Sequence, residues 1–192
     1  MDARAITLAA LDVLDELGFE GFTMRAVATR LDVQVGGLYY HFPDKAQLIQ
    51  AMTDELCSRM TASDPEGDWH TQAVAQCRQM RHAMLAIRDG ARLLVTGPFV
   101  GSSVALQVFE HLLTILASGV EDDRLGIAGE TLVGYIIGYV LQEQASAAIG
   151  PEPLLESISP VEHPTIVQQY GSIPADDRFT SAIEAIIAGF EK

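Results

Sequence analysis

The residues whose types and spacing could do chemistry lie mostly between positions 25 and 45. They combine two cations, a glutamine, a valine, a glycine pair, two tyrosines and a histidine: Arg25, Gln34, Val35, Gly36, Gly37, Tyr39, Tyr40, His41 and Lys45. Arg and Lys neutralise phosphate, and polar side chains read base edges in the grooves of a duplex. Glycines at the start of a helix let its backbone approach a phosphate closely. These residues predict a surface that contacts double-stranded DNA.

Two short helices joined by a tight turn would position these residues. Thr23 can cap the first helix through its hydroxyl, and Asp32 falls at the turn, where it tolerates a left-handed conformation. The apolar residues expected on the buried sides are Val27, Ala28 and Leu31 in the first helix and Val33, Leu38 and Phe42 in the second. This arrangement predicts a helix-turn-helix.

The segment that contains these residues resembles a known DNA-binding domain. Residues 23–52, TMRAVATRLDVQVGGLYYHFPDKAQLIQAM, are similar to that of the tetracycline-repressor (TetR) family, whose pattern includes L-Y-x-H and a following Lys. Shorter similarities continue at RDG before Ala91, at GYVLQEQA (138–145) and at IIAGFEK (186–192). The resemblance implies a homodimer that binds a palindromic operator, anchors the DNA backbone through Lys45 and responds to a small-molecule effector.

The composition and the net charge of the chain indicate the size of its core and how strongly it should bind nucleic acid. The chain has 192 residues, 48% of them hydrophobic, which is enough for a sizeable core. Its net charge of −14, taken alone, argues against a nucleic-acid partner. Residues 1–60 hold five Arg or Lys against nine Asp or Glu, so their balance is −4 and that of the remainder is −10. We therefore expect a modest, salt-dependent DNA affinity.

The two cysteines have no metal-binding spacing, and no signal peptide precedes them, which predicts free thiols in a reducing cytoplasm. The longest apolar run, residues 131–141, is far shorter than a bilayer span, so no membrane contact is expected.

Apolar residues recur at helical spacing through most of the remaining chain. The expected helices are residues 3–17, a connector helix at 45–61, and residues 69–88, 102–118, 122–148 and 177–190. A short helical turn is expected from residue 90. Residues 151–177 contain five prolines with weak periodicity, so they form a functional loop or are partly disordered. We assign residues 1–46 to a DNA-binding domain and 47–192 to a ligand-binding and dimerisation domain. The one turn-rich break is at 64–68. The expected fold is all-α.

The second domain is expected to hold a ligand cavity. Its candidate residues are Thr61, Gln76, Met80, Leu94, Phe99, Val108, His111, Tyr135 and Gln142. Tetracycline-binding members of the resembling family hold their drug through magnesium with a His and a Glu, and the matching positions here are Leu94 and Gln142. Neither supplies an imidazole or a carboxylate, so the cavity should be apolar, with no metal and no cofactor. His111 has an alternative place on a solvated face with Gln107 and Thr114.

An enzyme is not expected, because the five histidines are scattered and no catalytic motif spacing occurs. The preferred function is a ligand-responsive transcriptional repressor. The first alternative is a DNA-binding regulator of the same fold with no small-molecule inducer. The second is a helical small-molecule-binding protein that has lost DNA contact, which palindrome binding would exclude.

Overall fold

The computed structural model describes residues 2–61, 67–97, 102–149, 158–170 and 174–192, and these fold into helices without a strand. The helices are α1 (Ala3–Gly21), α2 (Met24–Arg30), α3 (Val35–His41), α4 (Lys45–Cys57), α5 (Trp69–Leu85), α6 (Gly90–Thr96), α7 (Ser103–Leu116), α8 (Asp122–Ile149), α9 (Pro164–Tyr170) and α10 (Ala175–Ala188). An isolated β-bridge joins Val120 to Glu191. The all-α prediction is confirmed.

Helices α1 to α3, here called the reader, follow from local capping and turn residues. Thr23 accepts a hydrogen bond from the backbone N–H of Ala26 and so caps α2. Asp32 turns the chain between α2 and α3 with φ of 54°, as predicted for that position. Gly18 has φ of 66° and interrupts α1, which explains why the regular part of that helix ends there.

The buried side of the reader differs from the prediction at one residue. Leu38 is fully buried and Phe42 is 7% exposed, but Val33 is 37% exposed. Val33 precedes Gln34, the N-cap of α3, so it belongs to the turn rather than to the helix face. The prediction that Val33 lies inward is therefore wrong.

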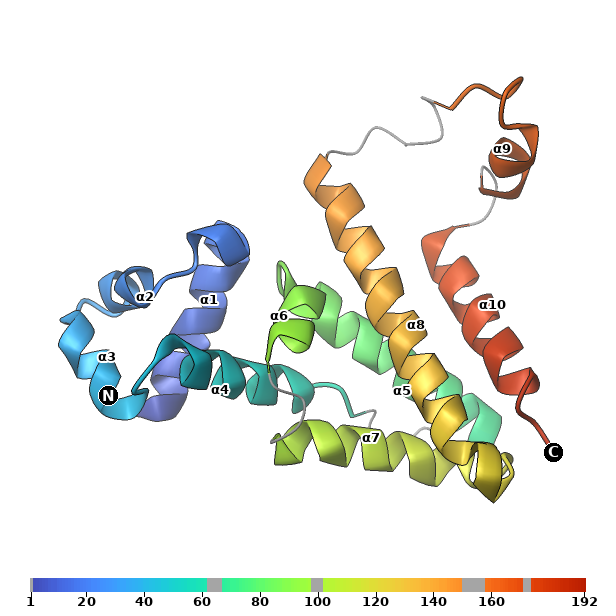
Figure 1. Ribbon diagram of the computed structural model, residues 1–192, viewed down its shortest axis with the longest axis horizontal. Helices are drawn as coiled ribbons and strands as arrows, with labels where there is room; N and C mark the ends of the chain where they lie inside the picture. Colours follow the sequence, from blue (N-terminus) through green and yellow to red (C-terminus); the bar gives the residue numbers. More distant parts are fainter. Residues whose placement is uncertain (1, 62–66, 98–101, 150–157, 171–173) are drawn as a thin grey trace.

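Helix α4 connects the reader to the remaining helices. Asp44 caps it by accepting a hydrogen bond from the backbone N–H of Gln47, and the helix packs on α1, α5, α6 and α7. Figure 1 shows α4 running from the reader into the body of the molecule. It ends at Cys57, four residues before the end predicted for the connector. One continuous helix therefore links the reader to the body.

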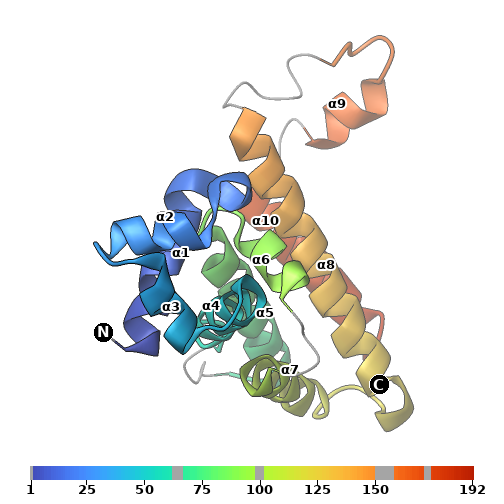
Figure 2. The same cartoon turned by 60° about the vertical axis from the view of Figure 1, so that its left-hand side comes forward.

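The body is a helical bundle around α5, which packs on α4, α6, α7, α8 and α10. Helices α8 and α10 lie side by side in both views (Figures 1 and 2). Helix α9 lies beyond the C-terminal end of α8, away from the bundle. The sequence did not predict α9, because two turns of helix in a proline-rich segment leave too little periodicity to detect.

Helix α8 is long and apolar, yet little of it is covered within one chain. By length and composition alone it could cross a membrane, a test that core and interface helices of soluble proteins also pass. Only 28% of that apolar window is buried within the protomer. The other residues of this window are exposed or half-buried within one protomer.

Candidate nucleic-acid interface and ligand cavity

The exposed face of α3 carries most of the residues predicted to contact DNA. Tyr40 is 87% exposed and Tyr39 is 47% exposed. A Cβ atom placed on Gly36 or Gly37 would meet no heavy atom within 4 Å, so the backbone of the first turn is open. A double helix could thus approach the start of α3 to backbone contact distance.

The other residues of this face differ in their exposure and in the contacts they make within the protein. Gln34 is exposed and makes no side-chain capping bond, whereas Val35 is half-buried against the core. The His41 ring contacts the Tyr40 ring edge to face, with centroids 5.3 Å apart. Tyr40 and Gln34 are exposed, whereas Val35 and His41 are half-buried, so the first two are more available to a partner.

Among the cationic side chains of the reader, that of Arg25 has the fewest charged partners within the described residues. It is exposed in the first turn of α2 and forms no ion pair within the described residues. By contrast, Arg30 pairs with Glu16, and Arg92 of α6 pairs with Glu20 at 2.8 Å. An exposed guanidinium in the first turn of α2 is suited to bidentate recognition of a guanine edge or a phosphate.

Lys45 has an internal role that the sequence did not reveal. Its Nζ donates a hydrogen bond to the Phe22 carbonyl at 2.7 Å and lies 4.9 Å from the centre of the Phe22 ring. This contact ties the start of α4 to the turn between α1 and α2. The residue remains exposed, and an ammonium has three N–H donors, so a phosphate could still bind to the same group.

We expect Lys45→Ala to weaken binding to every DNA sequence similarly and to reduce the salt slope of binding by about one unit per protomer, as for any lost phosphate contact. Loss of the bond to Phe22 should also lower the thermal midpoint of the reader. Titrations of DNA at several salt concentrations, together with melting curves, separate the two effects. A fall in thermal midpoint with an unchanged salt slope would show that Lys45 only braces the turn.

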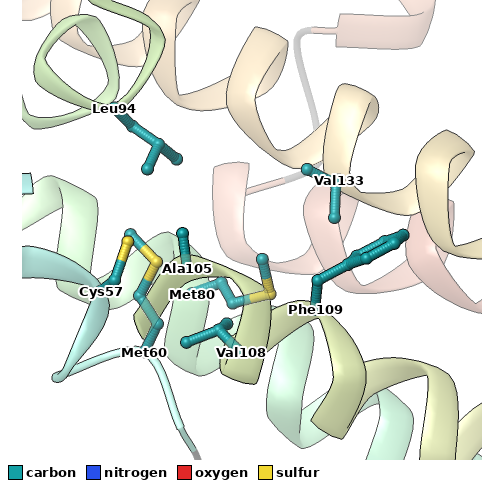
Figure 3. Close-up of a pocket in the computed structure, with 8 residues that line it drawn as sticks. All are labelled: Cys57, Met60, Met80, Leu94, Ala105, Val108, Phe109 and Val133. Carbon is teal, nitrogen blue, oxygen red and sulfur yellow. The ribbon is translucent and has the colours of Figure 1, made fainter. Parts of the chain in front are cut away.

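A small apolar cavity lies between α4 and the body helices. It is lined by Cys57, Met60, Met80, Leu94, Ala105, Val108, Phe109 and Val133. Figure 3 shows these side chains converging on one space, with the sulfur atoms of Cys57, Met60 and Met80 among them. About 20 Å³ remains free between them, which is little more than the space one water molecule needs. A larger molecule could bind only if the lining side chains or the surrounding helices moved apart.

Three of the residues predicted to bind ligand line this cavity, namely Met80, Leu94 and Val108. Gln76 is fully buried but is used internally, because its Nε2 donates to the Met60 carbonyl at 2.8 Å. Thr61 is exposed, and His111 is half-buried with its Nε2 atom unpaired among the described residues. None of Thr61, Gln76 and His111 is among the lining residues, and Phe99 lies outside the described residues.

Tyr135 and Gln142 line a different space from the apolar cavity. They border a surface groove between α8 and α10 together with Tyr139 and Arg178. The ring of Tyr135 stacks on that of Phe179, with centroids 6.0 Å apart, and burial raises its pKa. The prediction that Tyr135 and Gln142 share one site with Met80 and Leu94 therefore does not match the geometry.

The cavity lining does not fit a magnesium ion of the kind implied for tetracycline-binding relatives. Its side chains supply a thiol, two thioethers and hydrocarbon, whereas magnesium prefers oxygen ligands. Burial raises the pKa of the Cys57 thiol to about 12, so at neutral pH it carries no charge to attract a cation. Within the described parts of the chain, no three His, Cys, Asp or Glu residues gather as a metal site.

Together the exposed reader, the connector helix and the apolar cavity define a helix-turn-helix regulator with a separate ligand-binding body. Residues 6–52 match the bacterial regulatory proteins, tetR family, and residues 61–192 match the tetracyclin repressor-like, C-terminal domain. The chain belongs to the TetR family of bacterial regulatory proteins. Members of this family regulate transcription and are not enzymes.

Individual relatives agree with this assignment along the whole chain. The class G tetracycline repressor protein of Vibrio anguillarum is 30% identical over 203 residues, covering 100% of this chain and 94% of its own. A possible TetR family transcriptional regulator from Streptomyces coelicolor A3(2) has a TM-score of 0.86 at 28% identity, covering 98% of each chain.

Two further solved structures include partners. BioQ, solved with its double-stranded DNA operator, has a TM-score of 0.74 at 26% identity, covering 99% of this chain and 98% of its own. ActR of Streptomyces coelicolor, solved with (S)-DNPA, has a TM-score of 0.79 at 26% identity, covering 99% of this chain and 96% of its own.

Proposed function

We propose that this protein is a cytoplasmic transcriptional repressor that binds a palindromic operator as a homodimer and leaves it when a small, largely apolar molecule enters the cavity. The observation that carries the proposal is the connection between two features. An open reading surface and a small apolar cavity lie at opposite ends of α4, whose C-terminal Cys57 lines the cavity.

The two-fold arrangement is supported by the uncovered face of α8. Ile127 is 58% exposed and Leu141 is 36% exposed. Gly134 and Gly138 lie between them, and a Cβ atom added at either glycine would meet no heavy atom within 4 Å. These residues recur at helical spacing, so they form one apolar stripe that a second copy can cover. Two readers placed by such an axis about 34 to 36 Å apart would meet successive major grooves of a palindrome.

The chemistry of the cavity supports a neutral effector. Thioethers and aliphatic groups offer dispersion contacts and favourable sulfur–aromatic contacts, but they leave a charged ligand without a partner. The unbranched side chains of Met60 and Met80 can change rotamer to enlarge the space. An effector with an aromatic or aliphatic body and few polar groups fits these properties.

The small volume of the cavity also supports a second candidate, a regulator of the same fold with no small-molecule inducer. With only about 20 Å³ free, the same residues could serve as core packing alone. The two candidates differ in what a ligand does to bound DNA.

A screen for release from DNA tests the proposal. A DNA site is first selected from a random-sequence pool, and neutral apolar natural products are then titrated into the complex. We expect at least one compound to lower DNA affinity by about 5- to 150-fold, the usual range of allosteric coupling. Tetracycline with magnesium should release no DNA, since Leu94 and Gln142 supply neither the imidazole nor the carboxylate found at these positions in the tetracycline-binding relatives. Magnesium-dependent release by tetracycline would overturn the effector class, and release by no compound would favour the second candidate.

A further inference from the structure

Consecutive hydrogen bonds join α4 to α7 beside the cavity, and we call this contact between the two helices the seam. Ser102, the N-cap of α7, donates from Oγ to Asp54 Oδ1 on α4 at 2.5 Å. The same carboxylate oxygen accepts a bond from Gln50 Nε2 at 2.9 Å, and Ser102 Oγ accepts one from the Ala105 N–H at 2.9 Å. Ser102 is only 1% exposed. A hydroxyl bonded to an ionised carboxylate is one of the stronger hydrogen bonds in proteins.

This seam and the cavity are formed by the same parts of both helices. On α7, Ala105 bonds to Ser102 and also lines the cavity, and Val108 lines it one turn further on. On α4, Cys57 lines the cavity one turn after Asp54. A molecule too large for side-chain movement alone would have to move the first turns of α7 away from the end of α4. That movement separates Ser102 from Asp54.

The closed seam leaves one polar atom unsatisfied. Gln50 Oε1 is buried and has no hydrogen-bond partner among the described residues. Most buried polar atoms are paired, and an unpaired one destabilises the state that contains it. Separation of α4 from α7 would let water reach this oxygen. Opening therefore recovers part of the stability lost with the bond between Ser102 and Asp54.

We propose that Ser102 and Asp54 are positioning residues that hold α4 in its DNA-binding arrangement and set how readily a ligand opens the cavity. The inference rests on the proposed function. Asp54 lies nine residues from Lys45, or about 13 Å along α4, so the bond acts on the same rigid helix that carries the reader. A ligand that prefers the opened seam shifts the protein away from the arrangement that binds DNA.

Three variants separate the bond from other effects of substitution. Ser102→Asp keeps an N-cap for α7, because Asp caps as well as Ser, but sets a second carboxylate against Asp54. Ser103→Asp adds the same charge at the neighbouring exposed position and serves as the matched control. The double variant Ser102→Asp with Asp54→Asn removes the repulsion.

Each variant is measured for its thermal midpoint, its affinity for the selected DNA site, and its binding of N-phenyl-1-naphthylamine, a neutral fluorescent aromatic probe. We expect Ser102→Asp to bind the probe about tenfold more tightly and DNA about tenfold more weakly than wild type, within the usual range of allosteric coupling. Ser103→Asp should have the wild-type affinities for the probe and for DNA. The double variant should return both affinities to the wild-type values.

The outcomes distinguish this inference from the proposed function. Equal probe and DNA affinities for Ser102→Asp and Ser103→Asp would overturn the role of the bond, as would a double variant that recovers neither. If Ser102→Asp weakens DNA binding, Ser103→Asp does not and the double variant recovers, but no variant binds the probe, the bond positions α4 as inferred. In that case it is the apolar effector of the proposed function that fails.

Discussion

A protein carrying Gly134→Arg is expected to be a folded monomer that binds a palindromic site roughly 10²- to 10⁴-fold more weakly than the wild type, because the second half-site loses its high effective concentration without the dimer. Gly134 lies on the exposed stripe of α8, where an added Cβ atom would meet no heavy atom of its own protomer within 4 Å. Replacing a helical glycine should even stabilise the isolated helix by about 1 kcal/mol. Two arginines facing each other across a two-fold axis would instead repel and fill the space between the helices.

Sedimentation and DNA titration at the same protein concentration measure both parts of this expectation. Leu106→Arg is the matched control, because Leu106 is 52% exposed and belongs to α7 rather than to α8 or α10. It should leave mass and affinity unchanged. A Gly134→Arg protein that stays dimeric would show that the stripe on α8 is not the interface.

The second large effect is expected for Arg25→Ala. One good bidentate contact to a base gives about 1 to 3 kcal/mol of discrimination, and a dimer contains two copies. The variant should lose about 2 to 6 kcal/mol of affinity for the selected site, or roughly 30-fold at least, while its affinity for unrelated DNA falls less. Preference at one base pair in each half-site should relax.

Two companion variants define what Arg25 recognises. Arg25→Lys keeps the charge but loses the planar fork, so it should resemble Arg25→Ala if a base is read and the wild type if a phosphate is bound. Arg59→Ala removes an arginine near the far end of α4 that already pairs with Glu55 at 3.1 Å, and it should change little. Equal losses on all DNA sequences for Arg25→Ala would assign this residue to the phosphate backbone.

The reader could be predicted from sequence because its main features are local. The cap at Thr23, the left-handed turn at Asp32 and the open glycines of α3 each depend on residues a few positions apart. The role of Lys45 could not be predicted in the same way. Its hydrogen-bond acceptor, Phe22, is 23 residues earlier, and only the packing of α4 on α1 brings the two together.

The cavity could be predicted only in part, because helical spacing does not say which neighbour a face meets. On α8, Val133 lines the cavity, whereas Tyr135 packs on α10. Two residues along a helix rotate the side chain by about 200°, so these positions point to opposite sides. Cys57 and Met60 were not among the predicted residues, because the packing of α4 on α7 beside the cavity has no signal in the sequence.

The most direct test of the central claim is binding to the selected DNA site before and after five base pairs are inserted between its half-sites. Half a turn of DNA places the two half-sites on opposite faces of the duplex, where one dimer with fixed readers cannot contact both. We predict a complex of two protomers per uninterrupted site and a loss of roughly 10²-fold or more in affinity after the insertion. Equal affinity for both DNA fragments, or one protomer per site, would contradict the account of a dimeric, palindrome-binding regulator.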